Sequence, residues 1–214
     1  MIPPAALNPR GSRNDPETRA FPLGEPKMPT GISLLDIVRY LDVEHSLRYK
    51  PGAGKTYCNI YAVDYCNLAG AYLPRVWWNA AALAAIAAGK SVEPRYGETV
   101  LEVNANSLHE WLRKFGPEFG WWRLTRLSEV QDLANQGRVA VITGRRTDSK
   151  RPGHISCLIP ESDEHKAQRN EAHELQLPLQ SQAGVKNFCF GCGAGPWWTG
   201  AQFSDFGFWF NVTP

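Results

Sequence analysis

The sequence of 214 residues lacks any apolar run long enough to cross a membrane. A spanning helix needs roughly 20 apolar residues, and the richest candidate, residues 80–88, is short and mostly alanine. The N-terminus also lacks a charged start followed by an apolar stretch, which is the pattern of a Sec signal peptide. We therefore expect no membrane span and synthesis in the cytoplasm, with any export depending on another route.

The sequence also lacks a surplus of charge of one sign. The formal net charge is only +2, so the composition gives no reason to expect a nucleic-acid partner. The apolar fraction of 43% and the charged fraction of 21% are typical of a globular domain. A neutral substrate or a cell-wall polymer is compatible with this balance.

Cysteine is scarce, and its number is odd. Five cysteines without an export signal are expected to be free thiols, one of them a possible nucleophile, although a disulfide formed in an oxidising compartment stays open. Cys189 and Cys192 form a lone C-x-x-C pair. A structural zinc site uses four ligands and no second pair is present, so we expect no metal and no cofactor. A tight turn with Gly191 and Gly193, or a disulfide that joins one of the two to another cysteine, explains the pair better.

The hydrophobic pattern predicts a leader over residues 1–29 and one α+β domain over residues 30–214. The first half has helical periodicity, and the second half has short β-branched and aromatic runs, which together predict an antiparallel sheet. We expect a long helical insertion over residues 79–136. The predicted helices cover residues 32–45, 58–68, 79–89, 106–115 and 128–137. We expect Gly70 to close the second helix, Asn79 to cap the third, Asn106 or Ser107 to start the fourth, and Ser128 with Gln131 to form a capping box in the fifth. The predicted strands cover residues 138–143, 154–159, 175–181 and 203–212.

Two residues have the placement that thiol catalysis requires. Cys58 follows a glycine-rich loop and opens a predicted helix, where unpaired backbone N–H groups favour a thiolate. His154 follows Gly153 and opens a predicted strand. An imidazole beside a thiol activates it as a nucleophile, so we expect Cys58 to be the nucleophile and His154 its base.

A third polar group should orient the imidazole, and the strand over residues 175–181 with its following residues offers candidates. Alternation places Gln180 and Gln182 on one face and Ser181 on the other. We favour Gln182, at the end of the strand.

Further residues are candidates for substrate binding. Tyr57 and Asn59 flank the nucleophile, and Gln180 lies near the favoured orienting residue. Asp64, two turns into the Cys58 helix, is either a substrate contact or a surface or capping carboxylate. The tryptophan pairs at 77–78, 121–122 and 197–198 either stack on sugar rings or pack the insertion on the sheet.

The segments TYCNIYAVDYC and RPGHISCLIPE resemble the NlpC-type and CHAP amidohydrolases of the papain-like superfamily. The order Tyr-Cys-Asn, Gly-Arg-Val-Ala-Val-Ile, Gly-His-Ile and Gln-Ala-Gly is similar to phage lysins and antibacterial type VI secretion effectors. The resemblance covers roughly residues 35–200. It departs at Tyr57 and Asn59, where NlpC-type proteins usually have Asp before the cysteine and Ser-Gly after it.

The resemblance implies a papain-like fold and a metal-free peptidoglycan hydrolase. It assigns Cys58 as the nucleophile, His154 as the base and Gln182 as the orienting group. It implies amide cleavage in cell-wall peptide stems, by amidase or endopeptidase action, in the periplasm or cell wall of a target bacterium. An injected effector would have a secretion-system carrier and a cognate immunity protein as partners. A deamidase or transglutaminase-like toxin, or a non-enzymatic wall-binding module, stays open as an alternative.

Overall fold

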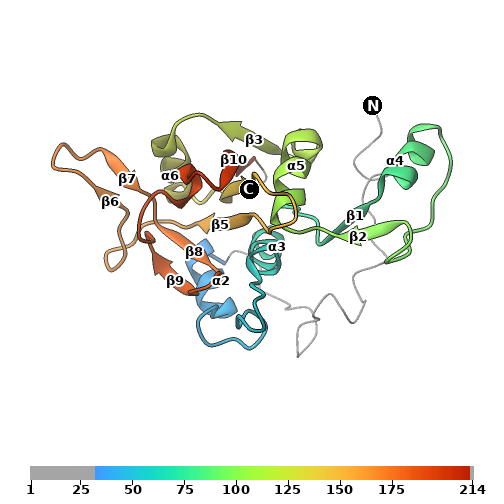
Figure 1. Ribbon diagram of the computed structural model, residues 1–214. Coiled ribbons are helices and arrows are strands. Elements are labelled where there is room, and N and C mark those ends of the chain that lie inside the picture. The colour runs from blue at the N-terminus through green and yellow to red at the C-terminus, as the bar shows by residue number, and fades with distance from the viewer. Residues whose placement is uncertain (1–31, 213–214) are drawn as a thin grey trace. The chain divides into compact units, whose positions relative to one another are not determined.

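The computed structural model describes residues 32–212, so the expected leader over residues 1–29 lies outside the described residues. The described chain combines five α-helices with mostly antiparallel sheet, which confirms the predicted α+β class. The contacts divide it into two compact units. We call Pro74–Val103 the insert unit, and residues 32–73 with 104–212 the main unit (Figure 1).

The main unit is built on a six-stranded sheet in which every neighbouring pair is antiparallel. The strand order is β3-β10-β4-β5-β8-β9. The bounds are β3 Trp121–Leu124, β4 Ala140–Arg146, β5 His154–Leu158, β8 Gln180–Gln182, β9 Phe188–Gly191 and β10 Phe203–Asn211. A separate two-stranded ladder joins β6 (Gln168–Arg169) to β7 (Leu175–Leu177).

Helices pack on both faces of this sheet (Figure 1). The bounds are α2 Leu34–Leu41, α3 Cys58–Leu68, α5 Ala105–Lys114 and α6 Leu127–Asn135, with short 3-10 helices η2 Gly116–Phe119 and η3 Trp197–Thr199. On one face α6 packs Val130 and Ala134 against Ile142 of β4 and Trp198 of η3. Strand residues alternate between faces, and the neighbouring Thr143 instead contacts His109 of α5 on the other face.

Helix α3 is the central helix of the main unit. Its residues from Cys58 to Cys66 are all buried, so it has no solvent-facing side over this length. A helix that is buried on every side must satisfy its polar groups internally. The hydroxyl of Tyr65 accordingly donates to the carbonyl of Leu158 at 3.1 Å, and Tyr61 bonds Ser181 at 2.5 Å. These contacts fix α3 on strands β5 and β8.

The insert unit contains β1 (Val76–Trp78), α4 (Ala80–Ala87) and β2 (Val100–Glu102). Strands β1 and β2 pair antiparallel, and Arg75 forms an ion pair with Glu102 at 2.6 Å. Asn79 caps α4 by accepting from the backbone N–H of Ala82, as its position in the sequence predicted. The predicted helical insertion over residues 79–136 is helical only in part, because β2 and β3 also lie within it.

Three predicted boundaries also need correction. Asn104, not Asn106, caps α5, because the side chain of Asn106 is bonded elsewhere. No side-chain cap precedes α6: Ser128 lies inside the helix, and Gln131 is buried and bonds the backbone of Ile159. The predicted strand over residues 175–181 is divided into β7 and β8, since the intervening Pro178 has no N–H to donate.

Candidate active site

The first residues of α3 and β5 come together at one end of the main sheet. The side chains of Cys58 and His154 form a hydrogen bond. The backbone N–H groups of Asn59 and Ile155 also bond the sulfur of Cys58. A thiol at a helix start, facing an imidazole at a strand start, is the arrangement required of a nucleophile and its base.

The environment of Cys58 favours the thiolate. Burial raises the pKa of the thiol, but the hydrogen bond and the charge of His154, with the N–H groups of Ile155 and Asn59, outweigh it and lower the pKa overall. Burial lowers the pKa of His154, but its bond to Cys58 and the thiolate charge raise it, and Gln182 adds to this rise. The two opposite shifts favour a thiolate–imidazolium pair.

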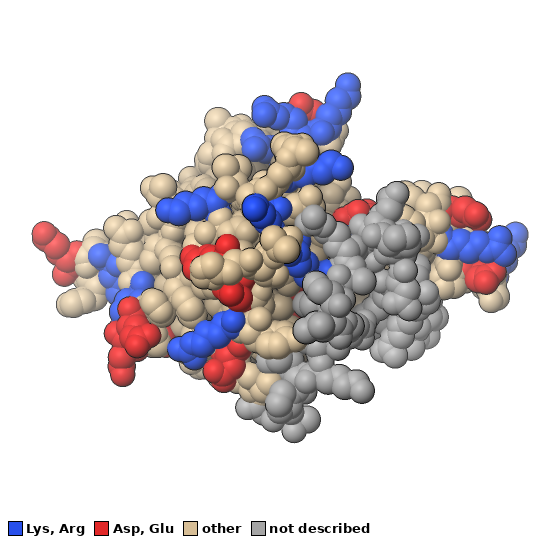
Figure 2. Space-filling model, turned by 90° about the horizontal axis from the view of Figure 1, so that it is seen from below, with Lys and Arg blue, Asp and Glu red and all other residues tan. Residues whose placement is uncertain are grey.

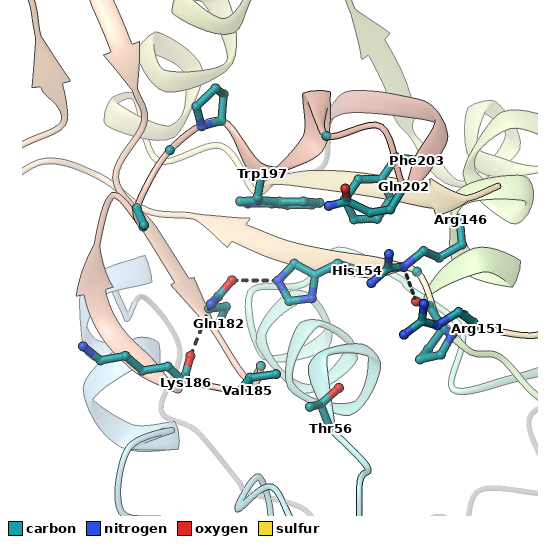
Figure 3. A pocket seen from close by; sticks show the side chains of 18 of the residues that line it. Thr56, Arg146, Arg151, His154, Gln182, Val185, Lys186, Trp197, Gln202 and Phe203 are labelled. Carbon is teal, nitrogen blue, oxygen red and sulfur yellow. Dashed lines mark hydrogen bonds between the residues drawn. The ribbon is translucent and has the colours of Figure 1, made fainter. Parts of the chain in front are cut away.

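Gln182 holds the other side of the imidazole ring (Figure 3). Its Oε1 lies 2.7 Å from Nε2 of His154, and its Nε2 donates to the carbonyl of Lys186 at 3.2 Å. The second bond fixes which way the amide points, so Oε1 accepts and His154 Nε2 must carry a proton. The remaining ring nitrogen, Nδ1, is therefore the one that faces Cys58.

Gly153 permits the close approach of chains at this corner. A Cβ atom at this position would lie 2.4 Å from the carbonyl oxygen of Gly144 and 2.5 Å from Oδ1 of Asn106. The β4–β5 register pairs Gly144 with His154. The absence of a side chain at residue 153 thus lets β5 start against β4 with His154 in place.

A pocket of about 920 Å³ opens at His154. One wall is aromatic: Trp197 meets His154 edge to face with ring centroids 4.6 Å apart, and Phe203 packs against Trp197. The rest of the lining comes mainly from loops, including Thr56 just before α3 (Figure 3). Cys58 is only 4% exposed and is not among the lining residues, whereas its hydrogen-bond partner His154 is.

Two of the expected substrate-binding residues lie outside this lining. Asp64 is buried and accepts from Arg48 at 2.7 and 3.1 Å and from Tyr49 at 2.8 Å. This ion pair anchors α3 to the loop before it, which corrects the expectation of a surface carboxylate. Gln180 is also buried, and its Oε1 accepts from Ser156 and Trp197. It holds the aromatic wall from behind.

The residues that flank Cys58 also lie outside the pocket lining. Tyr57 is the N-cap residue of α3 and is half-buried, while Asn59 is buried and places its backbone N–H on the sulfur. Their observed contribution is to the start of the helix.

The other four cysteines are also free. The side chains of Cys66 and Cys157 form a hydrogen bond, and burial, followed by this hydrogen bond, raises the pKa of the Cys157 thiol. Cys189 and Cys192 do not bond each other. Within residues 32–212 no three His, Cys, Asp or Glu side chains form a group that could hold a metal ion. The described helices include none that is long and apolar enough to span a membrane.

Several pocket residues were not identified from the sequence. Arg146 is the last residue of β4, Arg151 lies in the loop before β5, and Trp197 belongs to a tryptophan pair for which the sequence is compatible with two roles. A signal was present for Arg151, which lies three residues before His154. Nothing in the sequence pattern linked Arg146 or Trp197 to Cys58. In comparisons with known proteins, no family model matches the sequence, and no curated protein matches it.

Proposed function

We propose that this chain is a cysteine amidohydrolase with a papain-like arrangement of nucleophile helix and antiparallel sheet. The observation that carries the proposal is the line of hydrogen bonds from Cys58 through His154 to Gln182. The three residues come from α3, β5 and β8, which follow one another in the order expected from the NlpC-type and CHAP resemblance. Acyl transfer requires a nucleophile, a base and a group that orients the base, and the proposal assigns these parts to Cys58, His154 and Gln182.

In the proposed mechanism the Cys58 thiolate attacks the carbonyl carbon of an amide bond. The carbonyl oxygen takes up negative charge, and backbone N–H groups in the first turn of α3 stabilise it. No side-chain cap from Tyr57 occupies these groups. The His154 imidazolium then gives its Nδ1 proton to the leaving nitrogen, and the C–N bond breaks. This leaves a thioester on Cys58 and a neutral imidazole.

Water completes the cycle. Neutral His154 removes a proton from water as the oxygen attacks the thioester, and the C–S bond breaks to release a carboxylic acid and the thiolate. Gln182 keeps the ring oriented in both steps by accepting from Nε2. The imidazolium is restored at the end of the turnover.

We infer that the substrate is the peptide stem of peptidoglycan. The resemblance to lysins and antibacterial effectors supports this, and the aromatic wall of the pocket suits a ligand next to a sugar polymer. The proposal places the action in the periplasm or wall of a target bacterium. A cognate immunity protein and a secretion-system carrier belong to the effector form of the proposal.

The test is digestion of purified sacculi by the wild type and by Cys58→Ala, His154→Ala and Cys192→Ala. Cys192 is a free thiol outside the pocket and serves as the matched control. We expect soluble muropeptides from the wild type and from Cys192→Ala, and none from the other two variants. Mass analysis of the products identifies the bond that is cut.

Two outcomes would overturn the wall-hydrolase assignment. Intact sacculi together with Cys58-dependent modification of protein glutamine side chains would indicate a deamidase or transglutaminase-like toxin. Full biological effect from Cys58→Ala would indicate a non-enzymatic wall-binding module.

A further inference from the structure

The pocket at His154 is positively charged, although the molecule as a whole is nearly neutral. Arg146, Arg151 and Lys186 line it, and the described lining residues include no Asp or Glu. Elsewhere acidic and basic side chains both occur, as on the face seen in Figure 2. An excess of one sign inside a pocket selects ligands of the opposite sign.

Arg146 is held in place by contacts that, within residues 32–212, include no carboxylate. Its Nε donates to the carbonyl of Pro152 at 3.2 Å, and its guanidinium lies 5.1 Å from the centre of the Phe203 ring. No acidic partner of Arg146 occurs among residues 32–212, whereas the adjacent Arg145 pairs with Glu110 at 2.9 Å. Arg146 is half-buried, which reduces the screening of its charge.

Arg151 reaches the pocket from the other end of the same loop. Asn106 bridges the two ends: its Oδ1 accepts from the backbone N–H of Arg146, and its Nδ2 donates to the carbonyl of Arg151, both at 2.9 Å. The side chains of Arg146 and Arg151 lie on the same side of His154 (Figure 3). The described part of the chain shows no ion pair for Arg151.

We infer that Arg146 and Arg151 bind a carboxylate next to the scissile amide, so that the substrate is an acidic peptide. This inference rests on the proposed function and narrows its substrate class. A planar guanidinium pairs with a carboxylate through two parallel hydrogen bonds, a geometry that a lysine cannot reproduce. Peptide stems with free α-carboxylates satisfy this requirement, and stems whose carboxylates are amidated do not.

The experiment compares two synthetic stem peptides that differ only in having the α-carboxylate free or amidated. We expect wild-type kcat/KM to be on the order of 10- to 100-fold higher for the acidic peptide, the value of a hydrogen bond to a charged group. Arg146→Ala should lose this preference by cleaving the acidic peptide more slowly, with little change for the amidated one. Arg146→Lys should restore part of the preference.

Arg145→Ala is the matched control, because it removes the same charge one residue away and outside the pocket lining. It should keep the preference. Equal cleavage of both peptides by the wild type would overturn the carboxylate site but not the proposed hydrolase activity. If the wild type cleaved neither of the peptides nor the sacculi, the hydrolase proposal itself would be overturned. In Cys58→Ala, tighter binding of a short oligonucleotide than of the acidic peptide would identify a phosphate site instead.

Discussion

The contact between Cys58 and His154 predicts how the thiol should titrate. The wild-type thiolate should persist below the pH at which an ordinary thiol protonates, because His154 and two backbone N–H groups lower the pKa of Cys58. In His154→Ala the hydrogen bond and the charge of the imidazole are lost, while burial still raises the pKa of Cys58. Alkylation of Cys58 by iodoacetamide should therefore shift its midpoint to higher pH, as followed by mass spectrometry from acidic to alkaline buffer.

Cys192 provides the internal reference in the same spectra. Burial raises the pKa of this thiol and His154 is not among the groups that affect it, so its profile should not move. An unchanged profile for Cys58 in His154→Ala would show that the two residues do not form an ion pair in solution. For the wild-type enzyme, activity should fall on the acid side as Cys58 is protonated, and on the alkaline side as His154 loses its proton.

Gln182 is a positioning residue, and its effect should appear in kcat. Gln182→Ala leaves Nε2 of His154 without its 2.7 Å acceptor, so the ring can rotate away from Cys58. A small misplacement of a reacting group costs about 10²-fold in rate, so we expect a loss of this order in kcat with little change in KM. Gln182→Glu, which keeps an acceptor oxygen, should recover part of the rate. A larger effect of Gln182→Ala on KM than on kcat would assign Gln182 to substrate binding.

The start of strand β5 depends on Gly153. In Gly153→Ala the added carbon would meet the carbonyl of Gly144 and the side chain of Asn106, so the β4–β5 corner must shift. Overpacking of this kind costs about 1–3 kcal/mol. We expect a lower midpoint of thermal unfolding and a loss of activity, since His154 moves with the corner.

Gly52→Ala is the comparison for this variant, because nothing lies within 4 Å of the added carbon. It should unfold like the wild type. Wild-type stability and activity in Gly153→Ala would mean that this corner tolerates a side chain.

Helix α3 is anchored by the buried pair of Asp64 and Arg48. Removing one partner of a buried ion pair leaves the other charge uncompensated, so Asp64→Ala should lower the free energy of unfolding by about 3–5 kcal/mol. The matched change in the surface pair Arg126–Glu129, Glu129→Ala, should lower the free energy of unfolding far less, because water screens an exposed pair. Urea titration measures both. Loss of substrate binding without loss of stability in Asp64→Ala would restore its expected role in the site.

At the scale of the whole molecule, local signals predicted elements and long-range contacts decided the rest. Helix α3 has the predicted bounds, and its end is set locally by Gly70, which has a φ of 82° just past the helix. Asn106 carried the same kind of signal as a helix cap, but the β4–β5 loop takes its side chain. The short strand β3 was not predicted, because its extended structure depends on pairing with β10, which lies about 80 residues later in the chain.

The candidate site shows the same contrast between local signals and long-range contacts. Alternation along one strand separated Gln180 and Gln182 from Ser181, and the position at the strand end favoured Gln182, which the structure places beside His154. Asp64 carried no sign of its partner Arg48, which lies 16 residues earlier in a loop. Arg146 and Arg151 lie in the same pocket because of the length of their loop and the hydrogen bonds of Asn106 to both. Hydrophobic periodicity encodes neither feature.

The division into two units makes a prediction about the whole chain. Arg75 and Val103 meet at the base of the insert unit, where the backbone N–H of Val103 donates to the carbonyl of Arg75 at 3.2 Å. A short Gly-Ser linker can join ends that lie this close.

Replacement of residues 76–101 by such a linker should leave the main unit folded, because its sheet, α3 and the Cys58–His154 contact are formed within the main unit. The shortened chain should unfold in one cooperative transition, and Cys58 should keep its alkylation profile. The full chain, compared in the same buffer, is the control, and a shortened chain without that transition would show that the main unit needs the insert to fold.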